Sequence, residues 1–371
     1  MPDAFKVLIV DDSRLFRGEV AQVVQAVPGF VVVGSVFNGV KAVEFIQGHA
    51  VDLILLDQEM PEMNGLATLA AVVQHNAQAG TRTAVLMVSS HTTAAADVTI
   101  KALTGGAFDF VTKPSTAVDG PGAISRLKSD LVAKLKAFAH SRLPHLSAAM
   151  SHGSTPLLTP APSATFDRPG TRHVVRAIVI GASTGGPRAL GDVVPPLCGY
   201  FPGVPIFIVQ HMPAGFTASL AQNLAKQSGR NCVEAKDNQL VELNTIYVAP
   251  GGQHLNLRRG GMGIMTGLPD LPPENGCRPA VDVLFRSSAD CYGADLLAVI
   301  LTGMGNDGTA GLVQVKRAGG HVIAQNQATS VVWGMPGSAV AAGVVDEVHP
   351  LGDIAVACDL YQRRLVMKNS R

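Results

Sequence analysis

Three polar residues in the second half of the chain could together perform acyl transfer. Ser183 lies in the stretch IGASTGGP, His211 follows the apolar run IFIVQ, and Asp307 lies in LTGMGNDG. In a serine hydrolase the imidazole takes the proton of the serine hydroxyl, and the carboxylate holds the ring in the required tautomer. Backbone amides in the turn after Ser183 could bind the oxyanion. These residue types therefore predict nucleophilic catalysis through an acyl-enzyme.

The stretch around Ser183 allows other interpretations. Residues 181–185 fit the nucleophile-elbow pattern G-x-S-x-G, but a glycine-rich turn after a strand can also cradle a phosphate or merely permit close helix packing. A phosphate loop is disfavoured because G-x-x-x-x-G-K-[ST] and G-x-G-x-x-G are both missing. The α/β-hydrolase fold is disfavoured because its order is serine, acid, histidine, whereas here the histidine precedes the acid. The histidines of the second half have no metal-ligand spacing, which disfavours metal-dependent hydrolysis.

A second polar group, in the first half, could bind a metal ion and accept a phosphoryl group. Asp11 and Asp12 follow the first predicted strand, Asp57 the third, Ser89 the fourth and Lys113 the fifth. Three carboxylates in one crevice repel one another unless a hard cation binds, and Mg²⁺ prefers such oxygen ligands. An aspartate beside that ion can attack a phosphoryl group and form an acyl phosphate. The lysine and the serine hydroxyl could then hold the phosphoryl oxygens.

Two series of apolar runs must position these residues. Runs rich in Val, Ile and Leu at 6–10, 30–36, 52–57, 84–90 and 108–114 alternate with helical segments. A second series occupies 176–181, 205–210, 245–249, 296–302 and 320–324, and a terminal helix is expected over 352–366. Strands alternating with helices predict parallel α/β sheets, in which residues after the strands gather at one edge. The rival acids Asp282, Asp290 and Asp295 fall in or beside predicted helices instead.

The chain of 371 residues is long enough for two or three domains. We expect one α/β domain over 1–125, a helix end and a linker rich in Pro, Ser and Thr over 126–173, and a different α/β domain over 174–371. A net charge of +1 without a basic run argues against a nucleic-acid partner. Neither a secretory signal nor an apolar run near 18 residues is present, so we expect a cytoplasmic chain without membrane insertion.

The first half resembles the receiver domain of two-component response regulators over residues 5–125. The resemblance rests on VLIVDDS, DLILLDQEMPEMNG, VLMVSS and VTKP, which occur in this order. It implies a flavodoxin-like five-stranded parallel sheet, Asp57 as the phosphoacceptor, and a histidine kinase that donates the phosphoryl group. It further implies Asp11, Asp12, Asp57 and the main-chain carbonyl of Glu59 as Mg²⁺ ligands, Ser89 as the switch hydroxyl, Lys113 as the phosphate-binding lysine and Phe110 as the switch aromatic.

The whole chain resembles the chemotaxis protein-glutamate methylesterase family. Its second half carries IGASTGGP, VQHMP, VAPGGQHL, RPAVDVLF, LTGMGNDG and VWGMPGSA in order. The resemblance implies a Rossmann-like, mostly parallel catalytic domain with Ser183 as nucleophile, His211 as base and Asp307 as the acid that orients it. It implies Thr184 and Met304 amides as oxyanion donors. One departure is Cys277, which stands where that family often has a more polar residue.

The same resemblance implies a reaction and its control. The expected substrates are glutamate γ-methyl esters on the cytoplasmic helices of chemoreceptors, with deamidation of receptor glutamines as a second reaction. We expect a monomer whose esterase chemistry needs no cofactor, and a receiver that hinders access to Ser183 until Asp57 is phosphorylated. Rival hypotheses are a signalling adaptor without turnover, a response regulator that binds nucleic acid, and an unrelated serine hydrolase of small esters.

Overall fold

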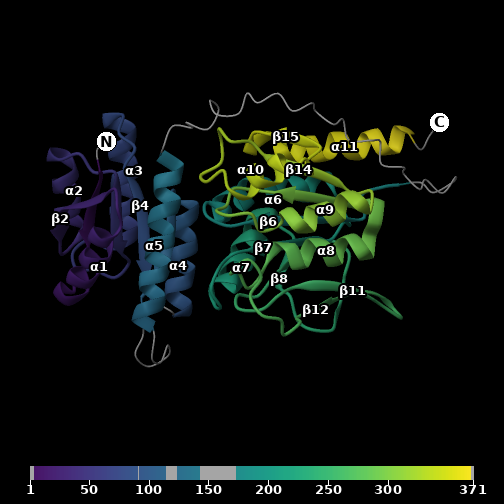
Figure 1. The fold of residues 1–371 in the computed structure, drawn as a ribbon, viewed down its shortest axis with the longest axis horizontal. Coiled ribbons are helices and arrows are strands. Elements are labelled where there is room, and N and C mark those ends of the chain that lie inside the picture. The colour runs from purple at the N-terminus through teal and green to yellow at the C-terminus, as the bar shows by residue number, and fades with distance from the viewer. Residues whose placement is uncertain (1–3, 91, 114–122, 143–172, 369–371) are drawn as a thin grey trace.

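The computed structural model describes residues 4–90, 92–113, 123–142 and 173–368. Two α/β parts lie side by side, the first drawn in purple and blue and the second in teal, green and yellow (Figure 1). The expected linker over 126–173 lies largely outside the described residues. No helix among the described residues is both long and apolar enough to cross a membrane.

The first part is a five-stranded parallel sheet in the order β2-β1-β3-β4-β5. Its strands are β1 (Phe5–Val10), β2 (Phe30–Val36), β3 (Leu53–Asp57), β4 (Ala84–Ser89) and β5 (Asp109–Thr112). The order is that of flavodoxin-like folds, as the sequence predicts. Buried side chains join α1 (Arg14–Ala26) and α5 (Ala123–Arg142) to one face, and α2 (Gly39–Gly48), α3 (Gly65–Ala79) and α4 (Thr93–Thr104) to the other.

Short polar residues start four of these helices. Ser13, Asn38, Asn64 and Thr92 precede α1, α2, α3 and α4, and each side chain accepts a hydrogen bond from an amide three residues later. Such caps satisfy amides that have no partner within the helix. The strands between these helices are almost continuously apolar because both faces of the sheet are covered.

The second part contains a seven-stranded sheet in the order β15-β14-β13-β6-β7-β10-β8, and every neighbouring pair is parallel. Its strands are β6 (Ala177–Ala182), β7 (Ile206–Gln210), β8 (Asn231–Glu234), β10 (Thr245–Val248), β13 (Leu296–Ile300), β14 (His321–Gln325) and β15 (Glu347–His349). A small antiparallel sheet joins β11 (Asn256–Gly260), β12 (Gly263–Gly267) and β9 (Gln239–Leu240). The mostly parallel α/β domain is therefore confirmed.

Two helix layers cover the large sheet. Buried side chains of α6 (Gly186–Tyr200), α7 (Phe216–Ser228) and α11 (Ile354–Lys368) pack on one face, and those of α8 (Val281–Tyr292), α9 (Thr309–Arg317) and α10 (Met335–Ala341) pack on the other. The sequence prediction found the five buried strands and missed β8, β9, β11, β12 and β15. The missed strands have two to five residues and are partly exposed, so they lack a long apolar run.

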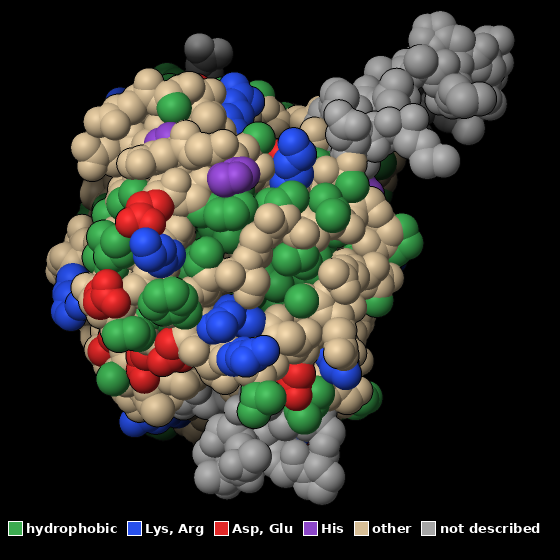
Figure 2. Space-filling view, turned by 90° about the vertical axis from the view of Figure 1, so that its left-hand side faces the viewer, with side chains coloured by type: hydrophobic (Ala, Val, Ile, Leu, Met, Phe, Trp, Pro, Cys, Tyr) green, Lys and Arg blue, Asp and Glu red, His purple; other side chains and the backbone are tan. Residues whose placement is uncertain are grey.

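The two parts touch through α4, which packs against α6 and α7. At the same boundary the Phe110 ring lies 4.6 Å from the Phe216 ring, centroid to centroid. In Figure 1, α4 and α5 lie between the labelled strands of the first part and the second part. Figure 2 shows the opposite end of the first part, where Lys and Arg lie among Asp, Glu and apolar side chains. The end that stays open to partners therefore carries mixed charge.

Candidate active site

Three adjacent strands bring the predicted catalytic residues to one edge of the large sheet. Ser183 directly follows β6, His211 directly follows β7, and Asp307 lies beyond the end of β13. Because β6 pairs in parallel with both β7 and β13, the carboxyl ends of all three strands meet. One neighbour of β6 is β7 and the other is β13, so the strand order switches direction at β6. Ligands of open α/β sheets bind at such a switch point.

A tight turn presents Ser183 at this edge. Gly185 has φ +78°, and a Cβ there would lie 2.6 Å from Cγ2 of Val331, so the turn requires glycine. The Ser183 amide donates to the Thr302 carbonyl at 3.0 Å, and Nε2 of Gln210 donates to the Ser183 carbonyl at 2.9 Å. The backbone of Ser183 is thus fixed from both neighbouring strands.

The predicted oxyanion donors lie beside this turn. Thr184 is buried just before α6, and Met304 is exposed in the loop after β13. Within the described parts of the chain, neither backbone amide donates to a protein acceptor. The Ser183 hydroxyl, on a side chain that is only 9% exposed, likewise makes no hydrogen bond to any described residue. These groups are therefore available to a ligand.

His211 and Asp307 form a direct pair. Nε2 of His211 lies 2.7 Å from Oδ2 of Asp307, and the same oxygen accepts the Val281 amide at 2.7 Å. The amides of Asp282 and Gly308 donate to Oδ1 at 3.1 and 3.0 Å. Burial alone would raise the pKa of Asp307, but the hydrogen bond to His211, the charge of His211 and the amides of Val281 and Asp282 hold that pKa below its usual value. The carboxylate stays ionised and leaves Nδ1 as the nitrogen that can take a proton.

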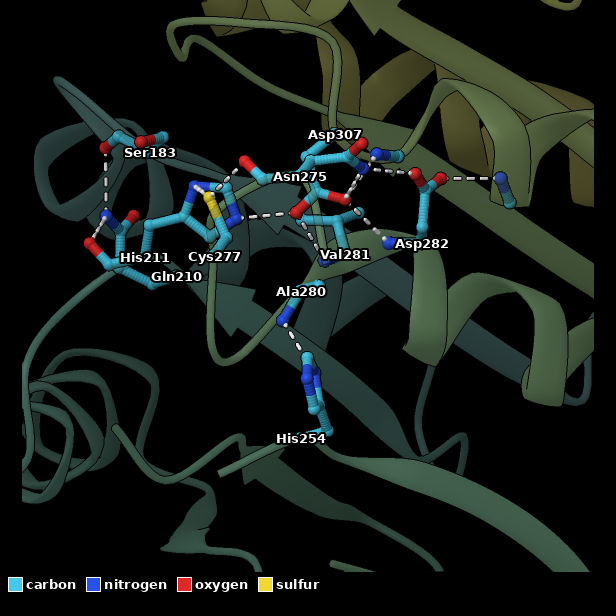
Figure 3. A network of polar contacts seen from close by, with 12 residues as sticks. Ser183, Gln210, His211, His254, Asn275, Cys277, Ala280, Val281, Asp282 and Asp307 are labelled. Atoms are coloured by element: carbon cyan, nitrogen blue, oxygen red, sulfur yellow. Dashed lines mark hydrogen bonds and ion pairs between the residues drawn. The ribbon is translucent and has the colours of Figure 1, made fainter. Parts of the chain in front are cut away.

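Cys277 contacts that nitrogen. Its Sγ lies 3.6 Å from Nδ1 of His211, so the thiol takes the position that a serine hydroxyl needs (Figure 3). Burial opposes protonation of the imidazole, but Asp307 and Cys277 outweigh it and raise the pKa of His211 to about 9. In this conformation Nδ1 of His211 therefore contacts Cys277 rather than Ser183.

The side-chain amide of Asn275, which lies in a loop, contacts the Asp307 carboxylate. Nδ2 of Asn275 donates to Oδ2 of Asp282 at 2.8 Å and to Oδ1 of Asp307 at 3.3 Å (Figure 3). Asp282 also accepts the Gly311 amide at 2.6 Å, and burial raises the pKa of this carboxyl to about 6. Sequence reasoning missed Asn275 and Gln210 as parts of the site, and it named Asp282 only as a rival acid to Asp307. Only Gln210 had a signal, because it is a polar residue directly at a strand end.

The first part of the molecule covers this edge. A cavity of about 310 Å³ lies between the two parts. Its wall consists of Phe110, Val111, Thr112, Asp130 and Lys134 from the first part and His211, Met212, Pro213 and 276–279 from the second. Nζ of Lys134 lies 3.5 Å from Oγ1 of Thr184 and is also paired with Asp109. Side chains of the first part therefore lie against the edge that carries His211 and Thr184.

A second polar cluster lies at the edge of the first sheet. Nζ of Lys113 is 2.7 Å from both Asp11 and Asp57, and carboxylate oxygens of Asp11, Asp12 and Asp57 lie within 4.8 Å of one another. Burial raises the pKa of Asp57 to about 6 against the effect of Lys113. Three carboxylates around one lysine leave an excess of negative charge, so this donor set fits a hard divalent cation such as Mg²⁺.

The other predicted residues of the first part lie near this cluster. Glu59 is exposed two residues after β3. Ser89 ends β4 and is fully buried, and its hydroxyl accepts a 2.7 Å bond from Thr99 in α4. Phe110 lies in β5 and points its ring at Phe216 of the second part. Ser89 and Phe110 therefore connect the cluster to the two elements that touch the second part.

Family models match both parts. Residues 178–358 match the model described as CheB methylesterase, and residues 7–124 match the response regulator receiver domain. The solved catalytic domain of the Thermotoga maritima CheB methylesterase is 41% identical, and the match covers 50% of this chain and 98% of that one with a TM-score of 0.48.

Named relatives match nearly the whole chain. A protein-glutamate methylesterase/protein-glutamine glutaminase of Nitrobacter hamburgensis is 40% identical over 95% of this chain and 93% of its own length. A relative of the same name from Dechloromonas aromatica is 41% identical over 96% of this chain and 97% of its own length. The chain therefore belongs to the family of protein-glutamate methylesterases/protein-glutamine glutaminases, in which a receiver domain precedes a CheB methylesterase domain.

Proposed function

We propose that this chain hydrolyses glutamate γ-methyl esters of chemoreceptors and deamidates receptor glutamines during chemosensory adaptation. The observation that carries the proposal is the meeting of Ser183, His211 and Asp307 at the ends of three adjacent parallel strands. The names and the identity of the relatives support the same activity. We also propose the cytoplasm as the place of action and a monomer as the working unit.

The reaction follows from the roles that these side chains can take. The hydroxyl proton of Ser183 moves to Nδ1 of His211 while Oγ bonds to the acyl carbon, and Asp307 stabilises the resulting imidazolium. The Thr184 and Met304 amides donate to the oxyanion. Methanol, or ammonia from glutamine, leaves with the proton from Nδ1. Water then attacks the acyl carbon and gives a proton to Nδ1, which passes it to Oγ of Ser183 as the acyl bond breaks and glutamate leaves.

This sequence requires a change from the conformation described above. Nδ1 of His211 must exchange Cys277 for the Ser183 hydroxyl, and the cavity between the two parts must open to a receptor helix. We propose that phosphorylation supplies this change. The receiver would then act as a cover that hinders the esterase until a histidine kinase of the chemosensory system phosphorylates Asp57.

We propose that α4 and β5 transmit the effect of Asp57 phosphorylation to the contact between the domains. Asp11, Asp12, Asp57 and the Glu59 carbonyl would hold Mg²⁺, which supplies charge neutralisation for phosphoryl transfer, and Lys113 would bind the phosphoryl oxygens. Ser89 would leave Thr99 to reach the phosphoryl group, which removes a bond that now ties β4 to α4. We propose that Phe110 reorders at the same time. Because α4 packs on α7, and Phe110 packs on Phe216, these two changes would loosen the contact between the domains.

We propose a receiver over 1–125, a helix end followed by a linker over 126–173, and a catalytic domain over 174–371. The packing of the receiver continues through α5, whose Leu127, Leu131, Leu135 and Phe138 lie in the core of the first sheet. The catalytic domain holds every group of the esterase reaction. Its separation from the receiver is what permits the cover to open.

Methanol release from methylated receptor membranes tests the function. We expect the full chain to release methanol and a small phosphodonor to increase the rate. Binding without turnover would support the adaptor hypothesis, and turnover of small esters alone would support an unrelated hydrolase. Either result would contradict the proposal.

A further inference from the structure

His211 and Cys277 form a pair of soft ligands beside the proposed nucleophile. Ligand atoms of His211, Cys277 and Asp307 lie within 4.8 Å of one another, and Sγ of Cys277 is 3.6 Å from Nδ1 of His211. Zinc binds thiolate at about 2.3 Å and imidazole at about 2.0 Å, which in tetrahedral geometry separates the two ligand atoms by about 3.5 Å. The pair therefore already has the spacing of two ligands around one zinc ion.

The imidazole is also held as a metal ligand requires. Histidine ligands usually donate their second ring nitrogen to a carboxylate, which fixes the ring and increases its basicity. Here Nε2 of His211 bonds to Oδ2 of Asp307 at 2.7 Å, and that oxygen also accepts the Val281 amide. Asp307 thus orients the imidazole through Nε2. The two atoms that remain to bind a metal ion are Nδ1 of His211 and Sγ of Cys277.

The pair is reachable and is not surrounded by uncompensated positive charge. Both residues line the cavity of about 310 Å³ between the domains, and Cys277 is half-buried. The nearby Arg278 is paired with Asp270, and Lys134 is paired with Asp109. An ion that enters the cavity can therefore bind the pair and keep water on its open positions.

We propose that a thiophilic divalent cation, Zn²⁺, binds between Sγ of Cys277 and Nδ1 of His211 and holds the esterase inactive. Binding releases the thiol proton, and any proton on Nδ1, to water. The ion then occupies the Nδ1 lone pair, so His211 can no longer take the proton of Ser183. Two protein ligands with open positions give a reversible site rather than a structural one. Mg²⁺, which prefers oxygen ligands, does not compete here. The inhibitory effect, unlike the binding, rests on the proposed function.

Cobalt absorption tests the binding without reference to activity. Co²⁺ bound to a thiolate has an intense charge-transfer absorption, which we expect when Co²⁺ is added to the full chain and which Zn²⁺ should abolish. Cys277→Ser should lose this band. Cys198→Ser is the matched control, because Cys198 is also half-buried but contacts Arg230 and not a histidine, and it should keep the band. No band in the unmodified chain, or a band that survives Cys277→Ser, would overturn the site.

Esterase rates test the effect. With Mg²⁺ in constant excess, Zn²⁺ should inhibit the unmodified chain, and a zinc chelator should restore the rate. Cys277→Ser should need at least about tenfold more Zn²⁺ for the same inhibition, which corresponds to about 1.4 kcal/mol of lost binding. Equal inhibition of both proteins would overturn the inference and leave the function intact. A cobalt band in a chain without esterase activity would instead retain the site and overturn the function.

Discussion

Removing one aromatic ring from the contact between the receiver and the catalytic domain should partly activate the esterase without phosphorylation. Phe110 of the receiver and Phe216 at the start of α7 pack with ring centroids 4.6 Å apart, and both rings are buried. Phe110→Leu keeps an apolar side chain of similar size but removes the ring pair. Because this pair exists only while the receiver covers the catalytic edge, its loss shifts the equilibrium between closed and open molecules toward the open form.

The expected size follows from the contact. An aromatic pair contributes about 0.5–1.5 kcal/mol beyond its buried area. At about 1.4 kcal/mol per factor of ten, the open fraction should rise about 2- to 12-fold while the closed form still dominates. The basal rate should rise by the same factor. The rate with a saturating phosphodonor should change little, because the activated molecule no longer holds the contact.

Methanol release from methylated receptor membranes, measured without phosphodonor, provides the assay. Phe216→Leu removes the same pair from the catalytic side and should raise the basal rate by a similar factor. Phe108→Leu is the matched control, since Phe108 adjoins the same strand but packs 5.7 Å from Phe138 inside the receiver. It should leave the basal rate unchanged. Unchanged basal rates in both Phe110→Leu and Phe216→Leu, or an equal rise in Phe108→Leu, would refute the reasoning.

Three further substitutions test other parts of the molecule. Asp57→Asn should abolish the response to phosphodonor and leave the basal methanol release unchanged; a retained response would exclude Asp57 as the phosphoacceptor. Asp307→Asn should lower kcat by about 10⁴-fold, because the amide favours the wrong tautomer of His211; a loss below tenfold would contradict its role. Gly185→Ala should lower the free energy of unfolding in urea by about 2 kcal/mol, because alanine at φ +78° is strained and meets Val331; Gly199→Ala, where a Cβ has open space, is the control.

The placement of the proposed catalytic residues could be predicted because it depends on local patterns. Ser183 and His211 each follow an apolar run directly, and parallel strands deliver such residues to one edge. The neighbouring positions of β13, β6 and β7 are a property of the topology, and the structure confirms them. The same logic places Asp57 and Lys113 at the end of the first sheet, where they are 2.7 Å apart.

The finer contacts could not be predicted, because they join segments without periodicity. Cys277 and Asn275 lie in an irregular loop, and Cys277 reaches His211 across 66 positions of the chain. The sequence places Asp282 correctly in a helix, but gives no sign that Asn275 connects it to Asp307. The close approach of the receiver to the Ser183 turn depends on contacts between side chains of two folded domains. The sequence pattern of either domain alone gives no information about such contacts.

The covalent intermediate tests the central claim most directly, because in this conformation the Cys277 thiol, and not the Ser183 hydroxyl, contacts the proposed base. The full chain, mixed with phosphodonor and a receptor-derived peptide carrying a glutamate γ-methyl ester, is quenched in acid during turnover and digested for mass spectrometry. Our account predicts the acyl adduct on the peptide that contains Ser183, and no adduct or methanol release in Ser183→Ala. An adduct on the peptide that contains Cys277, or undiminished methanol release by Ser183→Ala, would contradict it.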